Sequence, residues 1–123
     1  MGVKIKDIIS QFNALKPNQF DDKLKLKWLS DFDGMVYDTV LTTHEGEVSE
    51  WKPYTNDEEI LLIEDPYSEV YISLLTYKVD YFNQEYDKYN YSALMFASQL
   101  EAYQNYYNRT HLPLQNNKIN GVY

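Results

Sequence analysis

Two histidines are the residues of this 123-residue chain best suited to acid–base or metal chemistry. His44 opens the run His44-Glu-Gly-Glu47, and His111 lies near the carboxyl end. A metal site needs three or four ligands that converge on one point, but adjacent residues such as His44 and Glu45 point apart on a helix or a strand. The helical zinc spacing, two histidines four residues apart with a glutamate between them, is missing. We interpret His44 as a helix-end histidine in an exposed turn.

Other reactive groups form no catalytic pattern either. The carboxylate pairs Asp31/Asp33 and Asp57/Glu58/Glu59 lack the spaced oxygen ligands, mid-loop glycine and final glutamate of a calcium loop, so we expect solvated charge there. The chain contains four glycines and no cysteine, which excludes a glycine-rich phosphate loop, a disulfide and a thiolate metal site. No serine lies in a nucleophile elbow. The sequence therefore predicts a non-enzymatic protein without metal or other cofactor.

The net charge of −8 is unevenly distributed. Residues 1–30 carry six lysines and three acids, residues 31–69 carry twelve acids and one lysine, and residues 70–123 carry four of each. A segment as acidic as 31–69 should repel a phosphate backbone. One interpretation is a solvated face that aids solubility. The other is a surface that faces nucleic acid without adhering to it, or that meets a basic partner.

Tyrosine is over-represented toward the carboxyl end. Eleven of the thirteen tyrosines lie between Tyr67 and Tyr123. Because a small core cannot bury so many, some must lie on the surface, where tyrosine is typical of protein–protein interfaces. Arg109 is the one arginine, and it either complements the end of the last helix or anchors an interface.

Apolar periodicity predicts four helices. The first carries Ile5, Ile8, Ile9, Phe12 and Leu15 and ends at Pro17, and the second begins near Asp21 or Asp22, with Gly34 inside it at a close helix–helix contact. The third begins at Pro66 with Asp65 as its cap, breaks at 83–87, and pairs with a fourth that continues to Arg109.

The segment between the second and third helices has a different pattern. Residues 47–65 predict a loop or short β-hairpin with Ile60–Ile63 as the better strand. Residues 110–123 are predicted to be an extended tail that is disordered or ordered only by a partner. The fold class is therefore mostly α, a four-helix bundle-like domain over 1–109 with this loop and this tail.

Targeting signals are not expected. The amino-terminal residues alternate charged and apolar side chains and do not resemble a signal peptide, and no apolar run is long enough to span a membrane. Together with the absence of cysteine, these features favour an intracellular site of assembly.

A series of short motifs resembles a family of small head–tail connector proteins, also called adaptor or head-completion proteins, of tailed phages and prophages in low-GC Gram-positive bacteria. The motifs span about residues 15–113, and their order and spacing carry the resemblance. They are Leu15-Lys-Pro-Asn-Gln19, Lys27-Trp-Leu-Ser30, Asp33-Gly-Met35, Thr43-His-Glu-Gly46, Pro53-Tyr-Thr55 before Asp57, Pro66-Tyr67, Lys78-Val-Asp80, Tyr89-Asn90 with Ser92, and Tyr106-Tyr-Asn-Arg-Thr-His111 before Pro113.

The resemblance implies a virion protein assembled in the host cytoplasm. Such subunits form a ring, usually of twelve copies, beneath the portal protein, extend the DNA channel and dock the next neck or tail protein. It implies no catalytic residue, no specific DNA binding and no membrane. The alternatives from the residues are another phage assembly or tail-completion protein, or an acidic regulator of a basic host partner. The predicted interface residues are Trp51, Tyr54, Tyr103, Tyr106, Tyr107, Arg109, His111, Leu112 and Leu114.

Overall fold

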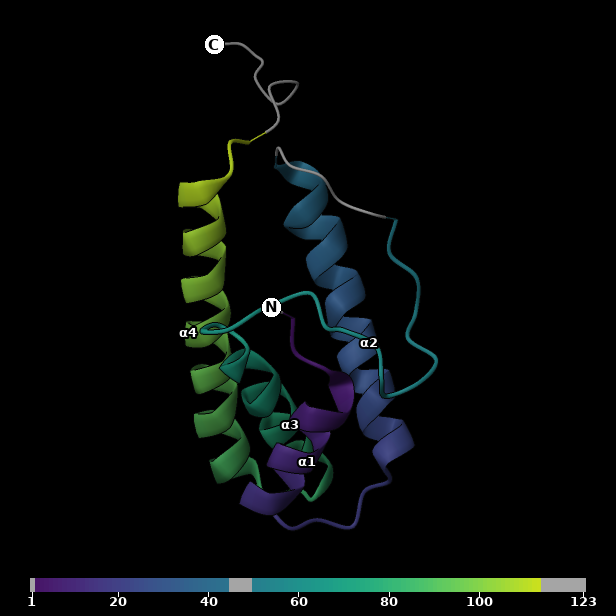
Figure 1. The fold of residues 1–123 in the computed structure, drawn as a ribbon. Coiled ribbons are helices and arrows are strands. Elements are labelled where there is room, and N and C mark those ends of the chain that lie inside the picture. Colours follow the sequence, from purple (N-terminus) through teal and green to yellow (C-terminus); the bar gives the residue numbers. More distant parts are fainter. Residues whose placement is uncertain (1, 45–49, 114–123) are drawn as a thin grey trace.

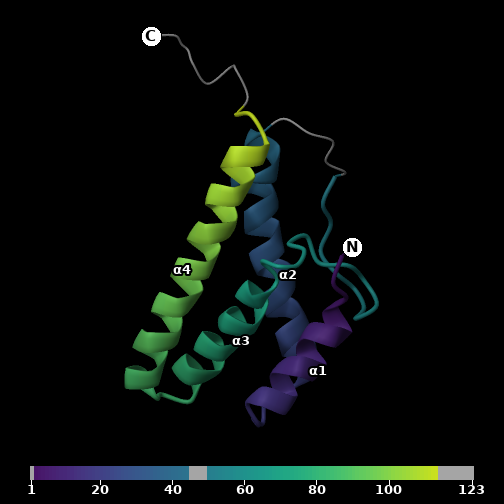
Figure 2. The ribbon, with the colours of Figure 1, turned by 60° about the vertical axis from the view of Figure 1, so that its left-hand side comes forward.

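The computed structural model describes residues 2–44 and 50–113 (Figure 1). These residues form four α-helices and one short 3-10 turn: α1 Ile5–Leu15, α2 Asp22–Thr39, η1 Leu41–Thr43, α3 Glu69–Phe82 and α4 Tyr86–Thr110. The predicted mostly helical class is confirmed. In Figures 1 and 2, α2 and α4 extend past the shorter α1 and α3 toward the end of the molecule at which α4 ends. Within the described ranges, no helix has the length and apolar character to cross a lipid bilayer.

The predicted stripe of α1 supplies one side of the core. Ile5, Ile8, Ile9 and Phe12 are buried, whereas Leu15, at the end of the helix, is exposed. The first turn of α1 has no side-chain cap, because the loop that precedes α3 caps it instead. Backbone carbonyls of this loop accept hydrogen bonds from the free N–H groups of α1; the Ile5 nitrogen lies 3.0 Å from the Glu59 oxygen.

This capping role explains why the predicted β-hairpin is wrong. Ile60 makes one isolated antiparallel bridge, with Lys4, and the described part of 47–65 contains no strand. The bridge cannot extend into a ladder because its partner segment becomes helical at Ile5. Leu61 and Ile63 are nevertheless buried in the core. The segment is therefore an extended loop that passes across the start of α1.

Helix α2 begins at a conventional cap, since the Asp21 carboxylate accepts a hydrogen bond from the Lys23 N–H at 3.3 Å. The close approach predicted at Gly34 exists, but it is made by a loop side chain. A Cβ built on Gly34 would lie 2.9 Å from Cη2 of Trp51. The expected helix–helix contact is therefore wrong: an indole from the loop lies against this position.

Replacing Gly34 by alanine should move the Trp51 indole and change the free energy of unfolding little. The gain in helix propensity is about 1 kcal/mol, and the clash with the ring offsets it. In a Trp51→Ala background the same change should stabilise the protein by the full ~1 kcal/mol. Urea unfolding measures both values, and tryptophan fluorescence reports the ring movement. Equal gains in the two backgrounds would contradict the contact.

Helix α3 begins three residues later than predicted. The expected start at Pro66 is wrong because Asp65 does not cap the helix: its carboxylate accepts from the Ser68 hydroxyl, and a separate turn places the Tyr67 N–H 2.9 Å from the Glu64 oxygen. The helix proper runs from Glu69. Its buried residues are Val70, Tyr71, Leu74, Leu75, Val79 and Asp80.

The turn between α3 and α4 falls within the predicted break. The Glu85 N–H donates to the Asp80 oxygen at 3.0 Å and the Gln84 N–H to the Tyr81 oxygen at 3.0 Å, which is the Schellman pattern. Gln84 occupies the left-handed position, at φ 61°, where glycine is usual. The tight turn makes α3 and α4 an antiparallel hairpin. Among the described helices, α4 has close backbone contacts only with α3.

Candidate functional site

The predicted interface residues fall into two groups that the fold keeps apart. Trp51 and Tyr54 lie on the loop against α2, with their rings in edge contact at 6.0 Å between centroids. Tyr103, Tyr106 and Tyr107 lie in the last turns of α4. A different set of exposed apolar side chains lies on the first half of α4, where the sequence did not predict an interface.

The loop group is organised by the buried carboxylate of Asp33. Tyr54 Oη donates to Oδ2 at 2.5 Å, the Leu62 N–H donates to Oδ2 at 2.9 Å, and Tyr71 Oη donates to Oδ1 at 2.7 Å. Tyr71 also accepts from the Ile63 N–H at 2.8 Å. These bonds join α2, the loop and α3. We call this arrangement the Asp33 network.

Burial shifts the titration of each member of the Asp33 network. Burial raises the pKa of Asp33 above its ordinary value. The three hydrogen bonds act in the opposite direction and lower this pKa, but burial has the larger effect. Burial, then the nearby Asp33 charge, also raises the pKa values of Tyr54 and Tyr71, so both hydroxyls remain protonated donors. Tyr54 is therefore engaged inside the molecule as part of a connection between elements.

The group in α4 forms an aromatic cluster. Tyr107 stacks on His111, with 3.8 Å between ring centroids and 7° between planes. His44 makes an edge contact with the same Tyr107 ring, at 5.2 Å between centroids. Tyr67 stacks at a tilt on Tyr106 at 4.8 Å. We name this set the Tyr107 cluster; its members are His44, Tyr67, Tyr103, Tyr106, Tyr107 and His111. It joins the end of α2 to the end of α4.

The two histidines serve this junction. His44 Nε2 lies 2.6 Å from Asn108 Oδ1 on α4, and Nδ1 lies 2.8 Å from the Val40 carbonyl oxygen. Both ring nitrogens of His44 therefore have partners. Within the residues that the structure describes, no group of three or more metal-binding side chains exists. The remainder of the His44-Glu-Gly-Glu47 run lies outside the described residues.

Burial separates the tyrosines of this cluster into different roles. Tyr103 and Tyr107 are only 5% and 8% exposed, and burial raises the pKa of each. Tyr106 is half-buried, and Arg109 and Leu112 are exposed. Of the predicted tail 110–123, Thr110 still belongs to α4, and Leu114 and the residues after it lie outside the described residues. Arg109 and Leu112 thus keep the accessibility that an interface requires.

Truncating Tyr107 to alanine is expected to lower the free energy of unfolding by about 3 kcal/mol, because the change removes a buried ring from between two histidines. Tyr106→Ala, at a half-buried position, should cost about half as much. Thermal or urea unfolding of the two variants compares them directly. If Tyr107→Ala proves as stable as the native chain, the ring is not part of the core.

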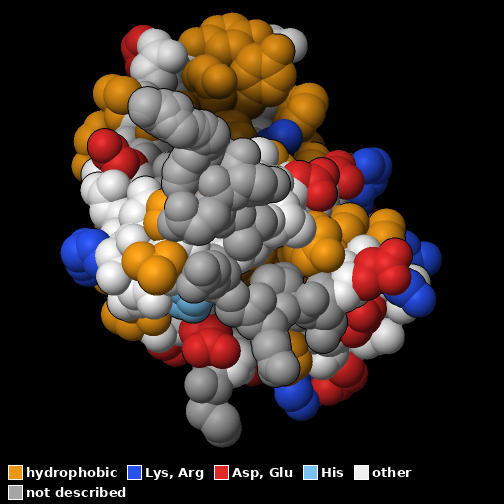
Figure 3. All heavy atoms as spheres, turned by 90° about the horizontal axis from the view of Figure 1, so that it is seen from above, with side chains coloured by type: hydrophobic (Ala, Val, Ile, Leu, Met, Phe, Trp, Pro, Cys, Tyr) orange, Lys and Arg blue, Asp and Glu red, His pale blue; other side chains and the backbone are white. Residues whose placement is uncertain are grey.

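Part of the acidic segment 31–69 is engaged within the molecule. One member, Asp33, is buried, and others pair with lysines from the amino-terminal third. These ion pairs are Asp31 with Lys27 at 2.8 Å, and Glu58 with Lys4 at 3.1 Å and with Lys6 at 2.8 Å. Seen from the carboxyl-terminal end, red and blue side chains are interspersed around the described rim (Figure 3). This face therefore shows mixed charge.

Three exposed apolar side chains lie close together in the first half of α4. Tyr91 is 68%, Leu94 71% and Met95 43% exposed, so α3 leaves a large part of each uncovered. We call these three residues the outer face of α4. The sequence held a signal for them: Leu94 and Met95 stand outside the apolar stripe that packs on α3, so α4 carries apolar residues on two sides.

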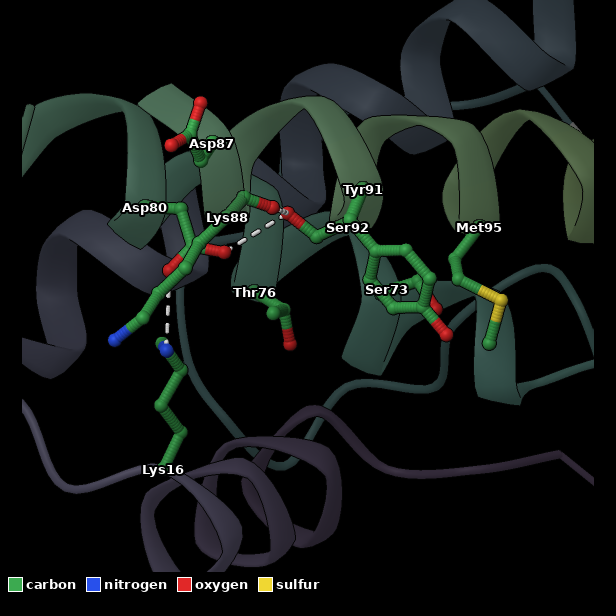
Figure 4. A pocket seen from close by; sticks show the side chains of 9 residues that line it. All are labelled: Lys16, Ser73, Thr76, Asp80, Asp87, Lys88, Tyr91, Ser92 and Met95. Carbon is green, nitrogen blue, oxygen red and sulfur yellow. Dashed lines mark hydrogen bonds and ion pairs between the residues drawn. The ribbon is translucent and has the colours of Figure 1, made fainter. Parts of the chain in front are cut away.

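A pocket of about 590 Å³ adjoins this outer face (Figure 4). It runs between α3 and α4 from Lys16 and Asp80 at one end to Tyr91 and Met95 at the other. Its remaining walls are Ser73, Thr76, Asp87, Lys88 and Ser92. We call it the Asp80 pocket.

The floor of the Asp80 pocket is a buried carboxylate. The Asp80 side chain is 3% exposed; Oδ2 accepts from the Ser92 hydroxyl at 2.9 Å, and Oδ1 lies 3.0 Å from Lys16 Nζ. Oδ1 has no further partner. Periodicity had suggested Asp80 only as a residue of the third helix, since a buried acid cannot be told from a solvated one by spacing. The arrangement can bind a polar or charged group.

Comparison with known proteins gives no further assignment: the chain matches no family model, no curated protein and no solved structure.

Proposed function

We propose that this chain is a structural subunit of the neck of a tailed phage, a head–tail connector that assembles as a ring under the portal protein. The ring has about twelve copies, as the resemblance implies, extends the DNA channel without binding DNA specifically, and docks the next neck or tail protein. The subunit is made in the host cytoplasm and ends in the virion. No residue is assigned a catalytic role.

The observation that carries the proposal is the outer face of α4. A tyrosine, a leucine and a methionine, all more than 40% exposed, lie within residues 91–95 of α4. Large apolar side chains grouped on an exposed helix are typical of a surface that another chain covers. A subunit that packs against its neighbours needs such a surface.

A second, smaller observation concerns the carboxyl-terminal end. Leu112 is 63% exposed directly after the Tyr107 cluster, which fixes the end of α4 to the end of α2. The end of α4, close to the last described residue, is therefore anchored. In the proposal, the tail after Pro113 contacts the portal or a neighbouring subunit.

Electron microscopy of this chain with a portal protein from the same genome tests the proposal. The two proteins are mixed, and the complex is compared with the portal ring alone. We expect an added ring of density, on the axis of the portal and on its tail-facing side. Portal particles that gain no density at saturating concentrations of the chain would contradict the connector assignment.

A further inference from the structure

We infer that the Asp80 pocket is a binding site for the lysine or arginine side chain of a neighbouring protein chain, which enters by taking the place of Lys16 beside Asp80. The chemistry of the site is that of a cation on an apolar stem. The protein origin of the cation rests on the proposed function, because it places a partner over the outer face of α4.

The first argument is the carboxylate itself. A carboxylate taken out of water needs a counter-charge or several donors. Asp80 has one hydroxyl donor, Ser92, and one cation, Lys16, while Oδ1 makes no hydrogen bond of its own. Asp33, by comparison, is satisfied by three donors. Asp80 thus has capacity for a further or better-placed donor.

The second argument is that Lys16 can be exchanged. Lys16 follows the last residue of α1, and its side chain is 28% exposed. Lys25 shows what a fixed lysine looks like in this fold: its side chain is 2% exposed, and Nζ lies 2.7 Å from Asn13 Oδ1 and 3.3 Å from Asp22 Oδ1. Among the described residues, the ammonium group of Lys16 contacts only Asp80, so this side chain can move outward without breaking a network.

The third argument is the sign of the remaining charge. Four charged residues line the pocket: Lys16, Asp80, Asp87 and Lys88. Both lysines are paired within the molecule, Lys16 with Asp80 and Lys88 with Glu85 at 3.3 Å. Asp87 makes no ion pair with the described residues, so one negative charge remains when Glu85, the partner of Lys88, is counted with the four lining residues. This balance favours a cation over an anion.

The fourth argument is shape. The pocket volume of about 590 Å³ is ample for one long side chain. In Figure 4 the carboxylate lies at one end and the Tyr91 ring and Met95 thioether lie at the other. An apolar stem can therefore pack along the α4 wall, with its cation at Asp80. Tyr91 and Met95 also belong to the outer face, so the pocket continues the surface assigned to the partner.

The experiment uses phenethylamine as probe and 2-phenylethanol as its uncharged match, titrated into the full chain and followed by NMR shifts of pocket amides. We expect the amine to bind, and Lys16→Met to strengthen its binding roughly tenfold because the internal competitor is gone. Asp80→Asn should abolish the preference for the amine over the alcohol. If Lys16→Met lowers stability, the amine should raise its melting temperature more than the alcohol does.

Equal binding of amine and alcohol, or an unchanged amine affinity in Lys16→Met, overturns the site. These readouts use the chain alone and are independent of assembly. The partner arm measures association of Asp80→Asn with itself and with the portal protein, where we expect roughly tenfold weakening. Unchanged association beside a normal amine response overturns the protein origin of the cation. A native chain that never associates contradicts the proposed function, whatever the amine result.

Discussion

Replacing Asp33 by asparagine is expected to lower the free energy of unfolding by about 3 kcal/mol, because three donors converge on the carboxylate. The amide offers one acceptor oxygen in place of two, and its NH₂ group would face a donor. With the NH₂ turned toward Tyr71, the tyrosine hydroxyl keeps the Ile63 N–H but loses its own acceptor. Either orientation leaves a buried donor unpaired and removes the charge that strengthened the other bonds.

The matched control for this change is Asp31→Asn on the same helix. Asp31 is exposed and, among the described residues, pairs only with Lys27, so its replacement should alter stability by less than about 0.5 kcal/mol. Urea unfolding of both variants gives the comparison. If the two variants lose the same small amount, the Asp33 network does not hold the loop between α2 and α3.

The effect of Asp33→Asn on the free energy of unfolding should change with pH in a defined direction. Burial raises the pKa of Asp33 above its ordinary value of 3.8, so the folded state holds this proton more tightly than the unfolded chain. The stability that Asp33 contributes is full below pH 3.8 and falls as pH rises through the folded-state pKa. The difference in unfolding free energy between the native chain and Asp33→Asn should therefore narrow with rising pH in that window. A widening difference would contradict the raised pKa.

Replacing Leu94 by glutamate is expected to weaken assembly at least tenfold while leaving the subunit folded. Leu94 is 71% exposed, so the change should alter unfolding free energy by less than about 0.5 kcal/mol. At an interface, the same charge would have to lose its water without gaining a partner. We expect the concentration needed for half-maximal assembly to rise at least tenfold, measured by analytical ultracentrifugation.

Leu24→Glu provides the control for Leu94→Glu. It makes the same chemical change at an exposed leucine in the first turn of α2, away from the outer face of α4. It should assemble as the native chain does. If Leu24→Glu and Leu94→Glu assemble equally well, the outer face of α4 is not the contact surface.

The helices could be predicted because their apolar stripes repeat at helical spacing. Ile5, Ile8, Ile9 and Phe12 are buried as the pattern indicates. The start of α3 was misplaced because proline and aspartate favour both a helix start and a turn, and the Ser68–Asp65 bond selects the turn. The hairpin was wrong for a similar reason: an apolar run at 60–63 indicates burial, and the position of α1 decides whether it has a strand to pair with.

The candidate site was less accessible to prediction than the helices. Composition correctly required that some tyrosines be exposed, and Tyr91 is among them. Composition could not show which tyrosines are exposed, because Tyr103 and Tyr107 lie on the same helix as Tyr91 but are buried. The partner of Asp80 was also hidden: Lys16 lies 64 residues earlier in the sequence, and only the packing of α1 against α3 brings the two together.

Self-assembly of this subunit is the central claim, and native mass spectrometry tests it most directly. The subunit mass is 14.7 kDa, so a ring is resolved from a monomer or dimer without ambiguity. The chain should give a closed oligomer of about twelve copies, either alone or when bound to the portal protein. A single 14.7 kDa species under both conditions, even at high protein concentration, would contradict the account.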